Sequence, residues 1–314
     1  MGAYAHPGNG DNEMLVTNDL MTRIQTNYSS LSKGQKLLAG YIKENYDKAA
    51  FLTAAKMGET VGVSESTVVR FASALGYKGY PDFQRALEEV VRNRMNSVQR
   101  MEVASGRMAQ ADILKAVLAS DEEKIRKTAE NIDQTAFDNA VNMLTSARRI
   151  YIIGVRSCAP LASFMAYYMN LMFDNVHQLI TSTSSELFEQ MVRVNEQDVI
   201  IGISFPRYSK RTEKALEFAK RRGANVIAIT DSPNSPINQL STCSLIAYSD
   251  MAAIVDSLVA PLSLINALLA ALCMKRKDQV SSTLVELEQI WGDYQVYEDS
   301  EIDTFRDSMN QYVE

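Results

Sequence analysis

Residues 61–80 read VGVSESTVVRFASALGYKGY, a run that combines several hydroxyl groups with one arginine and one lysine. Serine and threonine hydroxyls donate hydrogen bonds to base edges or phosphates, and an arginine can hold a guanine through two hydrogen bonds. On the outer side of a helix, these side chains provide the chemistry for reading duplex DNA. The candidate DNA-binding residues are Ser64, Glu65, Ser66, Thr67 and Arg70, with Lys78 and Tyr80 as contacts to backbone phosphates.

The spacing around these residues predicts a helix-turn-helix. A short helix over 51–62 ends near Gly62, and Ser64 stands at the N-cap of the next helix, although Thr67 replaces the glutamate of a capping box. In this geometry the second helix points its N-terminal turn into the major groove. An ordinary capped surface helix is the alternative that the spacing leaves open. The expected inward stripe consists of Val68, Phe71, Ala72 and Leu75, and Gly76 follows at the C-cap.

Charge is divided along the chain. Residues 20–110 hold 13 Lys and Arg against 8 Asp and Glu, a balance of +5, while residues 111–314 hold 19 against 27, a balance of −8. The first 19 residues add −3, which recovers the total of −6. A basic N-terminal third joined to an acidic remainder is typical of a DNA-binding module fused to another domain.

The composition excludes several classes of protein. Three cysteines without a short spacing and two histidines argue against a disulfide framework or a zinc site, and they suit a reducing cytoplasm. We therefore expect no metal and no cofactor. The most apolar run, 257–274, contains Asn266 and Pro261 and is shorter than the about 20 apolar residues of a membrane span, so it predicts a buried helix and no membrane association.

The second half of the chain alternates between two periodicities. Strand-like runs are separated by helical ones, and runs that are apolar throughout indicate a parallel sheet covered by helices on both faces. The predicted fold is therefore an all-α helix-turn-helix domain followed by an α/β domain with a parallel sheet. The five predicted strands are 148–155, 175–180, 198–204, 224–230 and 243–248.

These patterns also predict the domain organisation. The chain is expected to begin with a disordered tail, and two helices between 111 and 147 are expected to join the two modules. The predicted divisions are a tail at 1–19, the helix-turn-helix domain at 20–102, a helical linker at 103–130, the α/β domain at 131–292 and an acidic tail at 293–314.

The N-terminal module resembles the DNA-binding domain of the RpiR/MurR family of bacterial transcriptional regulators. The resemblance is carried by Val63, Ser64, Thr67, Arg70 and Phe71, and by the segment from Leu75 to Phe83 that reads LGYKGYPDF. It covers about fifty residues in register. It implies that helix 64–75 is a recognition helix and that the protein binds double-stranded operator DNA as a dimer.

Four loops follow predicted strands and precede helices: 154–159, 181–186, 204–212 and 230–236. A parallel sheet binds its ligands at the carboxyl ends of its strands, and helix N-termini there favour anions. Helix capping alone explains the Ser and Thr of each loop, so that alternative stays open. The candidate effector-binding residues are Arg156, Ser157, Ser184, Glu186, Ser204, Arg207, Tyr208 and Ser209.

Residues 111–290 resemble the sugar isomerase (SIS) domain that follows the DNA-binding domain in the same family. The family implies a phosphorylated sugar held by the first loop and by a Ser-x-Ser-Gly-x-Thr segment after the third strand. Here that segment reads Ser-Phe-Pro-Arg-Tyr-Ser over 204–209, and Arg156 stands where a glycine is common. Pro206 removes a hydroxyl and a backbone donor, whereas Arg156 and Arg207 can bind a phosphate or carboxylate. Pairing of each arginine with Glu186 or Asp231 is the alternative.

These observations together predict a cytoplasmic, non-enzymatic regulator whose operator affinity is controlled by a small anionic sugar, either a phosphosugar or a sugar acid. The alternative is a phosphosugar isomerase with an inherited helical domain. Isomerisation needs a base, and His177 lies inside a strand-like run, which favours a structural role. The apolar helices around 165–173 and 257–274 are expected to pair two copies into a homodimer or a dimer of dimers.

Overall fold

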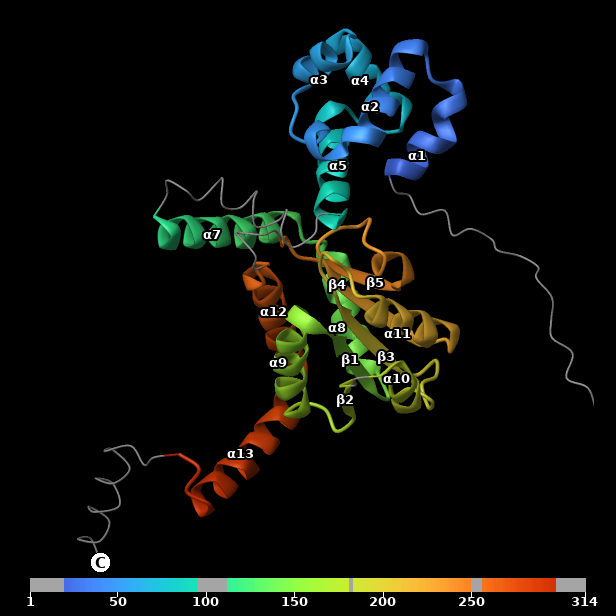
Figure 1. Cartoon of the computed structure of the whole chain (residues 1–314). Coiled ribbons are helices and arrows are strands. Elements are labelled where there is room, and N and C mark those ends of the chain that lie inside the picture. Colours follow the sequence, from blue (N-terminus) through green and yellow to red (C-terminus); the bar gives the residue numbers. More distant parts are fainter. Residues whose placement is uncertain (1–19, 95–111, 181–182, 250–255, 298–314) are drawn as a thin grey trace, which may run out of the picture. The chain divides into compact units, whose positions relative to one another are not determined.

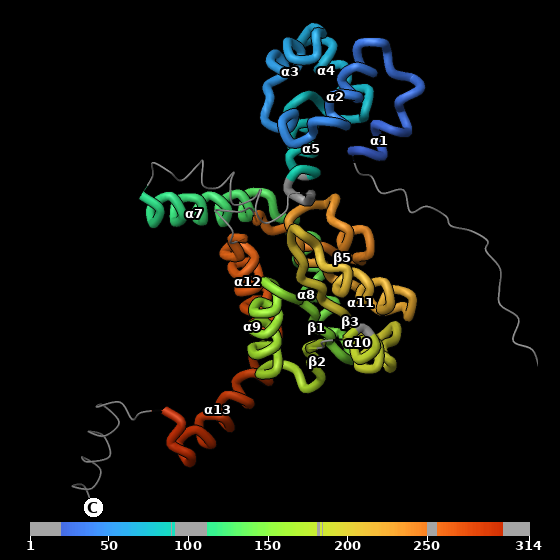
Figure 2. The backbone as a smooth tube through the Cα atoms, viewed as in Figure 1, coloured from blue at the N-terminus to red at the C-terminus, as the bar shows by residue number. Residues whose placement is uncertain are grey.

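The computed structural model describes residues 20–94, 112–180, 183–249 and 256–297 (Figure 1). The predicted tail at 1–19, the first part of the predicted linker and residues 298–314 lie outside the described residues. Contacts within the chain divide it into two compact units, residues 1–100 and residues 101–314 (Figure 2).

The N-terminal unit is entirely helical where it is described. Its α-helices begin with capped N-termini where hydroxyl side chains precede them: Ser32 caps α2 in a complete capping box with Gln35, and Thr53 caps α3. A single 3-10 turn follows α1. The helices are α1 (Leu20–Asn27), α2 (Lys33–Ala49), α3 (Ala54–Val61), α4 (Glu65–Ala74) and α5 (Tyr80–Arg94).

The core of this unit is built around α4. Its inward stripe, predicted from the spacing, is confirmed, because Val68, Phe71 and Ala72 are fully buried. The ring of Phe71 meets that of Phe83 from α5 edge to face at 5.6 Å between centroids. The outer side of α4 is thereby fixed relative to the rest of the unit.

The turn between α3 and α4 depends on two glycines. Gly62 ends α3 in the left-handed region at φ 77°, as the sequence predicted for the end of this helix. A Cβ on Gly58 would lie 2.7 Å from the carbonyl oxygen of Val63, so only glycine lets the turn pack so closely against α3. At the other end of α4, Gly76 has φ 83° and closes the helix as predicted.

The C-terminal unit contains a five-stranded parallel sheet in the order β2-β1-β3-β4-β5. All five predicted strands are confirmed, each trimmed by one or more residues. Residues along the strands alternate between two apolar layers, as Ile150 and Ile152 face one and Tyr151 and Ile153 the other. The strands are β1 (Ile150–Gly154), β2 (Val176–Gln178), β3 (Val199–Ile203), β4 (Asn225–Thr230) and β5 (Cys243–Ile246).

Helices cover both faces of this sheet, as Figure 1 shows. One face packs against α8 (Gln134–Ser146), α9 (Ala159–Asn170) and α12 (Val259–Lys275), and the other against α10 (Ser184–Gln190) and α11 (Lys210–Arg221). At the amino edge, Arg148 donates two hydrogen bonds to the fully buried carboxylate of Asp198, at 2.9 and 2.8 Å. The loops that precede α9, α10 and α11 lie at the opposite, carboxyl edge.

Two helices at the margins of the sheet differ from the expected organisation. Helix α7 (Ile113–Asn131), which forms most of the predicted linker, packs against α12 within the C-terminal unit. Helix α13 (Lys277–Asp293) was not predicted, because the sequence analysis expected the apolar helix at 257–274 and no helix after it.

No single helix among the described residues is long and apolar enough to cross a membrane. Helices α12 and α13 together reach the length, but they are bent by 96° at their junction. The predicted buried helix at 257–274 is confirmed as α12, which buries Leu264, Ile265 and Leu268 against the sheet.

We predict that Gly58→Ala destabilises the N-terminal unit by about 1–3 kcal/mol, because the added Cβ meets a backbone oxygen that cannot move without opening the turn. Gly40→Ala is the matched control. Gly40 lies inside α2 with open space around it, so alanine there should stabilise the unit by about 0.5–1 kcal/mol. Calorimetric unfolding of the full chain measures both. A shift of the two variants in the same direction would contradict this account of the turn.

Candidate functional site

The N-terminus of α4 carries a cluster of hydroxyl groups. The Oγ atom of Ser64 accepts the backbone N–H of Thr67 at 3.3 Å, which confirms the predicted N-cap. The same oxygen lies 2.9 Å from Oγ of Ser66 and 2.8 Å from Oγ1 of Thr67. Three hydroxyls thus converge at the positive end of a helix, where acceptors such as phosphates or base edges are favoured.

Arg70 belongs to the same surface. It is exposed, and its guanidinium donates to the backbone oxygen and to Oγ of Ser66, both at 3.1 Å. These two bonds hold the arginine over the first turn of α4, beside the exposed Glu65. A guanidinium held by a neutral hydroxyl and a carbonyl keeps its full charge, so it can exchange these partners for a base or a phosphate.

The sequence did not single out two further residues of this surface. Val69 is 38% exposed although it is apolar, and Ser73 is exposed one turn farther along α4. Each follows a residue of the inward stripe directly in the sequence, so the helical spacing could have indicated that both side chains face outward. An exposed apolar side chain on such a helix can contact the methyl group of thymine.

The two predicted phosphate contacts beyond α4 differ in environment. Lys78 is exposed, whereas Tyr80 is buried and donates its hydroxyl to the carbonyl oxygen of Leu52 at 2.6 Å. Burial, with a smaller contribution from Glu88, raises the pKa of Tyr80 to about 12. Its hydroxyl therefore stabilises the core of the unit, and Tyr80 is not part of the proposed DNA-binding surface.

In the C-terminal unit, the strand order brings two predicted loops together. From β1 the chain crosses to β2 on one side of β1, whereas β3 pairs with β1 on its other side. The order of the strands therefore reverses between β1 and β3. Gly154 and Ile203 are paired at the ends of these strands, and residues 155–159 and 204–209 leave the sheet side by side. Open parallel sheets bind ligands at such a point.

Arg156 has an unusual backbone. Its φ is 58°, in the left-handed region that favours glycine, which accounts for the expectation of a glycine at this position. Gly154 permits the tight turn, because a Cβ there would lie 2.6 Å from the carbonyl oxygen of Cys158. Arg156 and Ser157 are both exposed at the end of β1.

The loop after β3 is held by its own serines. Oγ of Ser204 accepts the N–H of Ser209 at 3.1 Å, and Oγ of Ser209 caps α11 by accepting the N–H groups of Arg211 and Thr212. These bonds use the backbone donors at the start of α11 that could have held an anion. Each serine acts as an acceptor in these bonds, with Ser204 buried and Ser209 half-buried.

Tyr208 and Arg207 complete this loop. Tyr208 donates its hydroxyl to Oδ1 of Asp231 at 2.8 Å, and Asp231 follows β4 at the same edge of the sheet. Arg207 is exposed. Arg156 is exposed in the same way at the end of β1. The carboxyl edge therefore carries the two exposed arginines Arg156 and Arg207 and the carboxylate of Asp231. The sequence indicated Asp231 only as a possible partner for an arginine.

The remaining predicted effector residues lie at the start of α10. Ser184 is its first residue, and Glu186 lies in its first turn, where its N–H donates to Oγ1 of Thr183. This confirms that the loop 181–186 precedes a capped helix. Residues 181 and 182, which complete that loop, lie outside the described residues.

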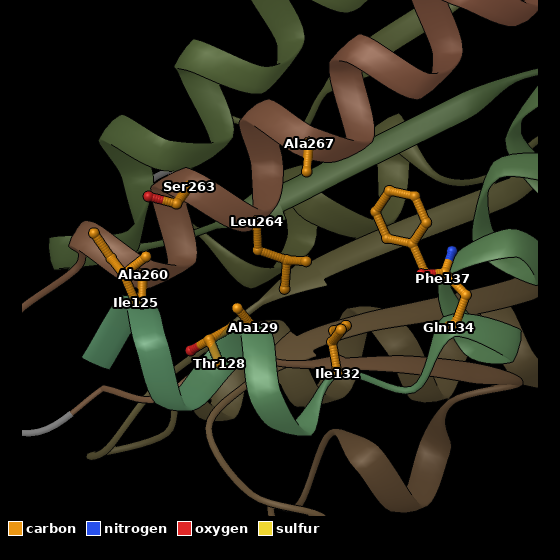
Figure 3. Close-up of a pocket in the computed structure, with 10 residues that line it drawn as sticks. All are labelled: Ile125, Thr128, Ala129, Ile132, Gln134, Phe137, Ala260, Ser263, Leu264 and Ala267. Carbon is orange, nitrogen blue, oxygen red and sulfur yellow. The ribbon is translucent and has the colours of Figure 1, made fainter. Parts of the chain in front are cut away.

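Figure 3 shows a pocket elsewhere in the same unit. It has a volume of about 410 Å³ and lies between α7, α8 and α12, with mainly apolar walls that include Ile125, Phe137 and Leu264. None of the predicted effector-binding residues lines this pocket.

His177, the histidine that the described part of the chain contains, does not lie in the loops of the carboxyl edge. His177 is exposed on β2, and its ring stacks on that of Tyr151 with 5.3 Å between the ring centroids. Tyr151 lies three residues before the end of β1, so this ring pair is roughly 10 Å from the carboxyl end of that strand. In the part of the chain that the structure describes, no three His, Cys, Asp or Glu side chains form a group that could hold a metal ion.

Two domain families match the chain in the order of its two units. Residues 18–94 match the helix-turn-helix domain of the rpiR family, and residues 143–271 match the SIS domain. The chain belongs to the RpiR family of transcriptional regulators. The first match spans α1 to α5, and the second runs from the end of α8 through the sheet and into α12.

Relatives within the RpiR family carry the same description. An uncharacterized HTH-type transcriptional regulator of Clostridium perfringens is 26% identical over 68% of this chain and 76% of its own length. The HTH-type transcriptional regulator HexR of Escherichia coli is 26% identical over 72% of this chain and 77% of its own length. The structure of the NanR protein of Vibrio vulnificus complexed with ManNAc-6P has the same fold, with a TM-score of 0.56 at 23% identity, covering 90% of this chain and all of that one.

We predict that Tyr80→Phe lowers the stability of the N-terminal unit by about 0.5–1.5 kcal/mol, because one hydrogen bond to Leu52 is lost. DNA affinity should stay unchanged at temperatures where the variant is folded. The raised pKa means that the contribution of this hydroxyl to stability is complete below pH 10 and is lost as the pH rises through about 12. Calorimetry between pH 8 and pH 12 and DNA titration test both parts.

Lys78→Ala is the comparison for that variant. The exposed Lys78 is expected to contact phosphate, so its loss should weaken binding to all DNA sequences and reduce the salt dependence by about one ion. Weakened DNA binding by folded Tyr80→Phe protein would show that the buried hydroxyl does take part.

Proposed function

We propose that this regulator binds operator DNA through the first turn of α4 and that an anionic sugar at the carboxyl edge of the sheet controls its affinity. The observation that carries the DNA part is the hydroxyl cluster of Ser64, Ser66 and Thr67, held together with Arg70 on one exposed surface. Glu65, Val69 and Lys78 extend it.

The proposed DNA contacts fall into two classes. Arg70 and Ser66 are placed to contact base edges, since they lie on the outer side of the helix that enters the major groove. Ser64, Thr67 and Lys78 lie at the helix start and in the following loop, where phosphate contacts fix the register of a helix-turn-helix. Sequence specificity is therefore assigned mainly to Arg70.

The proposed effector is a small sugar that carries a phosphate or a carboxylate. Its anionic group would bind Arg156 and Arg207 at the ends of β1 and β3, with the hydroxyls of Ser157, Ser204 and Ser209 as further donors. Asp231 and Tyr208 can accept hydrogen bonds from sugar hydroxyls on the other side of the loop. The ManNAc-6P bound by NanR, a protein of the same fold, supports a sugar phosphate.

Ser184 and Glu186 are assigned to the far end of the same ligand. They begin α10, which follows β2, the strand next to β1, so a sugar that reaches beyond Arg156 would meet the N-terminus of that helix. We assign Glu186 to a sugar hydroxyl, because a carboxylate does not bind the anionic group itself.

The connection between the two functions is assigned to α7. Ser257 donates its hydroxyl to Asp121 of this helix at 2.6 Å, and Tyr248, just after β5, donates its N–H to Oγ1 of Thr128 at 2.9 Å. A displacement at the carboxyl edge would therefore reach α7, which precedes the sheet in the chain and follows the DNA-binding unit. An effector that favours one arrangement of α7 shifts the population of the DNA-binding state.

The proposal includes a dimer that binds a palindromic operator. Pairing through α9 and α12, as the sequence predicted, is supported by Tyr167 and Tyr168, which are 60% and 41% exposed on α9. A two-fold symmetric dimer sets the distance between two recognition helices and hence the spacing of the half-sites.

A phosphosugar isomerase is the second candidate, since SIS domains are named for that activity. The relatives are named as transcriptional regulators, and this observation favours the regulator. His177 lies on β2, and the carboxylates that the proposed site contains are those of Glu186 and Asp231. Incubation of the protein with hexose and pentose phosphates would test it: formation of an isomeric sugar would favour the enzyme, and unchanged substrates favour the regulator.

We predict that Arg70→Ala weakens binding to the operator by about 10-fold to 100-fold, because one bidentate contact to a base is worth about 1–3 kcal/mol. Arg85→Ala is the matched control, since Arg85 is an exposed arginine of the same unit that already pairs with Asp82 at 3.1 Å. The operator is first selected from genomic fragments, and affinities are then measured at fixed salt. Equal losses in both variants would mean that only overall charge matters.

We predict that Arg156→Gly and Arg207→Ala each abolish the response of DNA binding to the effector while leaving DNA affinity without effector intact. Arg156→Gly should also stabilise the sheet domain by about 1 kcal/mol, because glycine suits the positive φ. Melting temperatures with a panel of sugar phosphates and sugar acids identify the effector, and DNA titration measures the response.

Arg193→Ala is the control for these two variants, since Arg193 is exposed and precedes β3 at the opposite edge of the sheet. It should keep the full response. An unchanged response in both Arg156→Gly and Arg207→Ala would refute the role of the arginines without touching the DNA-binding part of the proposal.

A further inference from the structure

The chain from the start of α1 into α2 is basic throughout. Residues 20–43 contain four Lys and Arg residues and no Asp or Glu. This stretch therefore carries positive charge that no acid of its own sequence offsets, and it belongs to the same unit as α4. None of the DNA contacts predicted from the sequence lies in it. Its position relative to α4 decides whether this charge can reach DNA.

This segment packs against both ends of α4. At the C-terminal end, Nη1 of Arg23 donates to the carbonyl oxygen of Leu75 at 3.3 Å. At the N-terminal end, a Cβ on Gly34 would lie 3.2 Å from Cγ2 of Thr67, so the start of α2 is in close contact with the hydroxyl cluster of α4. The chain from Arg23 to Gly34 therefore spans the length of α4 along one side of it.

The side chains of this segment divide into a buried and an exposed set. Ile24 and Leu31 are buried in the same core as the inward stripe of α4. Tyr28 is 47% exposed, and Lys33, which directly precedes the glycine in contact with α4, is exposed as well. Because the buried set shares one core with α4, the exposed set lies on the outer surface beside that helix.

An aromatic ring holds a second cation of this surface. Nζ of Lys36 lies 5.6 Å from the centroid of the Tyr28 ring, at a distance typical of a cation–π interaction. The ring is neutral, so the ammonium group keeps its positive charge. Tyr28 also has a hydroxyl group, which is a common donor to phosphate oxygens. Tyr28, Lys33 and Lys36 together form a basic ridge beside α4.

A helix in the major groove brings the elements beside it close to the phosphate strands. The groove is about 12 Å wide, which is close to the diameter of one helix with its side chains. An element that packs along one side of that helix therefore meets the strand that borders the groove. Positive charge suits this position, because contacts to phosphates supply a large share of the affinity of DNA-binding proteins.

We propose that the basic ridge is a second DNA-contacting surface, which binds the phosphates of one strand beside the major groove. Lys33 and Lys36 each neutralise a phosphate, and Tyr28 donates a hydrogen bond to the same strand. The ridge adds affinity and fixes the register of α4 without reading the base sequence. This inference rests on the proposed docking of α4, but it concerns different residues and a different measurable property, the salt dependence of binding.

DNA titrations of the full chain over a range of salt concentrations test the ridge. Lys33→Ala with Lys36→Ala should weaken binding to the operator and to unrelated DNA alike, by about 10-fold or more at low salt, and should reduce the slope of log K against log salt by about two. The specificity ratio between the two DNAs should stay unchanged, because the ridge contacts no bases. Circular dichroism confirms that the variant is folded.

The matched control removes the same charge from the same helix. Lys43→Ala with Lys48→Ala changes two exposed lysines, the first of which lies ten residues beyond Lys33 and thus roughly 15 Å farther along α2. This control should retain the slope of the unaltered protein. Equal losses in the two double variants would overturn the ridge, because only the overall charge of the unit would then matter.

The two proposals fail in different ways. If Lys33→Ala with Lys36→Ala keeps the original slope while Arg70→Ala loses its preference for the operator, the ridge is overturned and the role of α4 stands. If the unaltered protein binds no genomic fragment, the proposed function is refuted, and the ridge with it.

Single methylphosphonate substitutions along the operator give an independent measurement. Neutral positions on one strand that weaken binding of the unaltered protein, but not of Lys33→Ala with Lys36→Ala, are expected at one border of each half-site. If every position weakens both proteins equally, the lysines contact no phosphate, and the ridge is overturned.

Discussion

Helices cover both faces of the parallel sheet, and this burial constrains the rest of the C-terminal unit. Every residue of β1 and β3 is buried, so these strands are built from apolar side chains and glycine. Polar and charged groups are then confined to the two edges. At the amino edge the pair of Arg148 and Asp198 is satisfied within the protein, whereas at the carboxyl edge Arg156 and Arg207 are exposed. The difference between the amino edge, where the charges are paired, and the carboxyl edge proposed to bind the effector follows from the burial of the faces.

The same logic operates in the smaller unit through α4. Phe71 and Val68 fix one side of this helix in the core, and the tight turn at Gly58 sets the angle at which α3 meets it. The opposite side is then necessarily exposed, and there the hydroxyl groups and Arg70 are held by one another. In the proposed DNA-binding surface these side chains are held by contacts within a single helix, so little ordering would be left for the moment of binding.

The altered loop after β3 changes how an anion would be held. In the family pattern, hydroxyls and backbone donors are expected to form the site, but here Ser204 and Ser209 are already engaged in holding the loop and capping α11. In the proposed site, charge from Arg156 and Arg207 would replace neutral donors, while Asp231 would add a carboxylate on the side of β4. A site of this kind would discriminate by charge and by the position of sugar hydroxyls, and would suit a different ligand from that of a site made only of serines and threonines.

The sequence by itself determined the elements and their order. Apolar runs and helical spacings predicted all five strands and the recognition helix, because burial imposes periodicity on local sequence, and the N-cap at Ser64 follows from its own hydroxyl. Only the tertiary structure decided which polar groups are free. Tyr80 donates to Leu52, 28 residues away, and Tyr208 to Asp231, 23 residues away, so neither commitment is visible in local spacing. The packing of α7 on α12 likewise depends on contacts between distant segments, which no sequence period encodes.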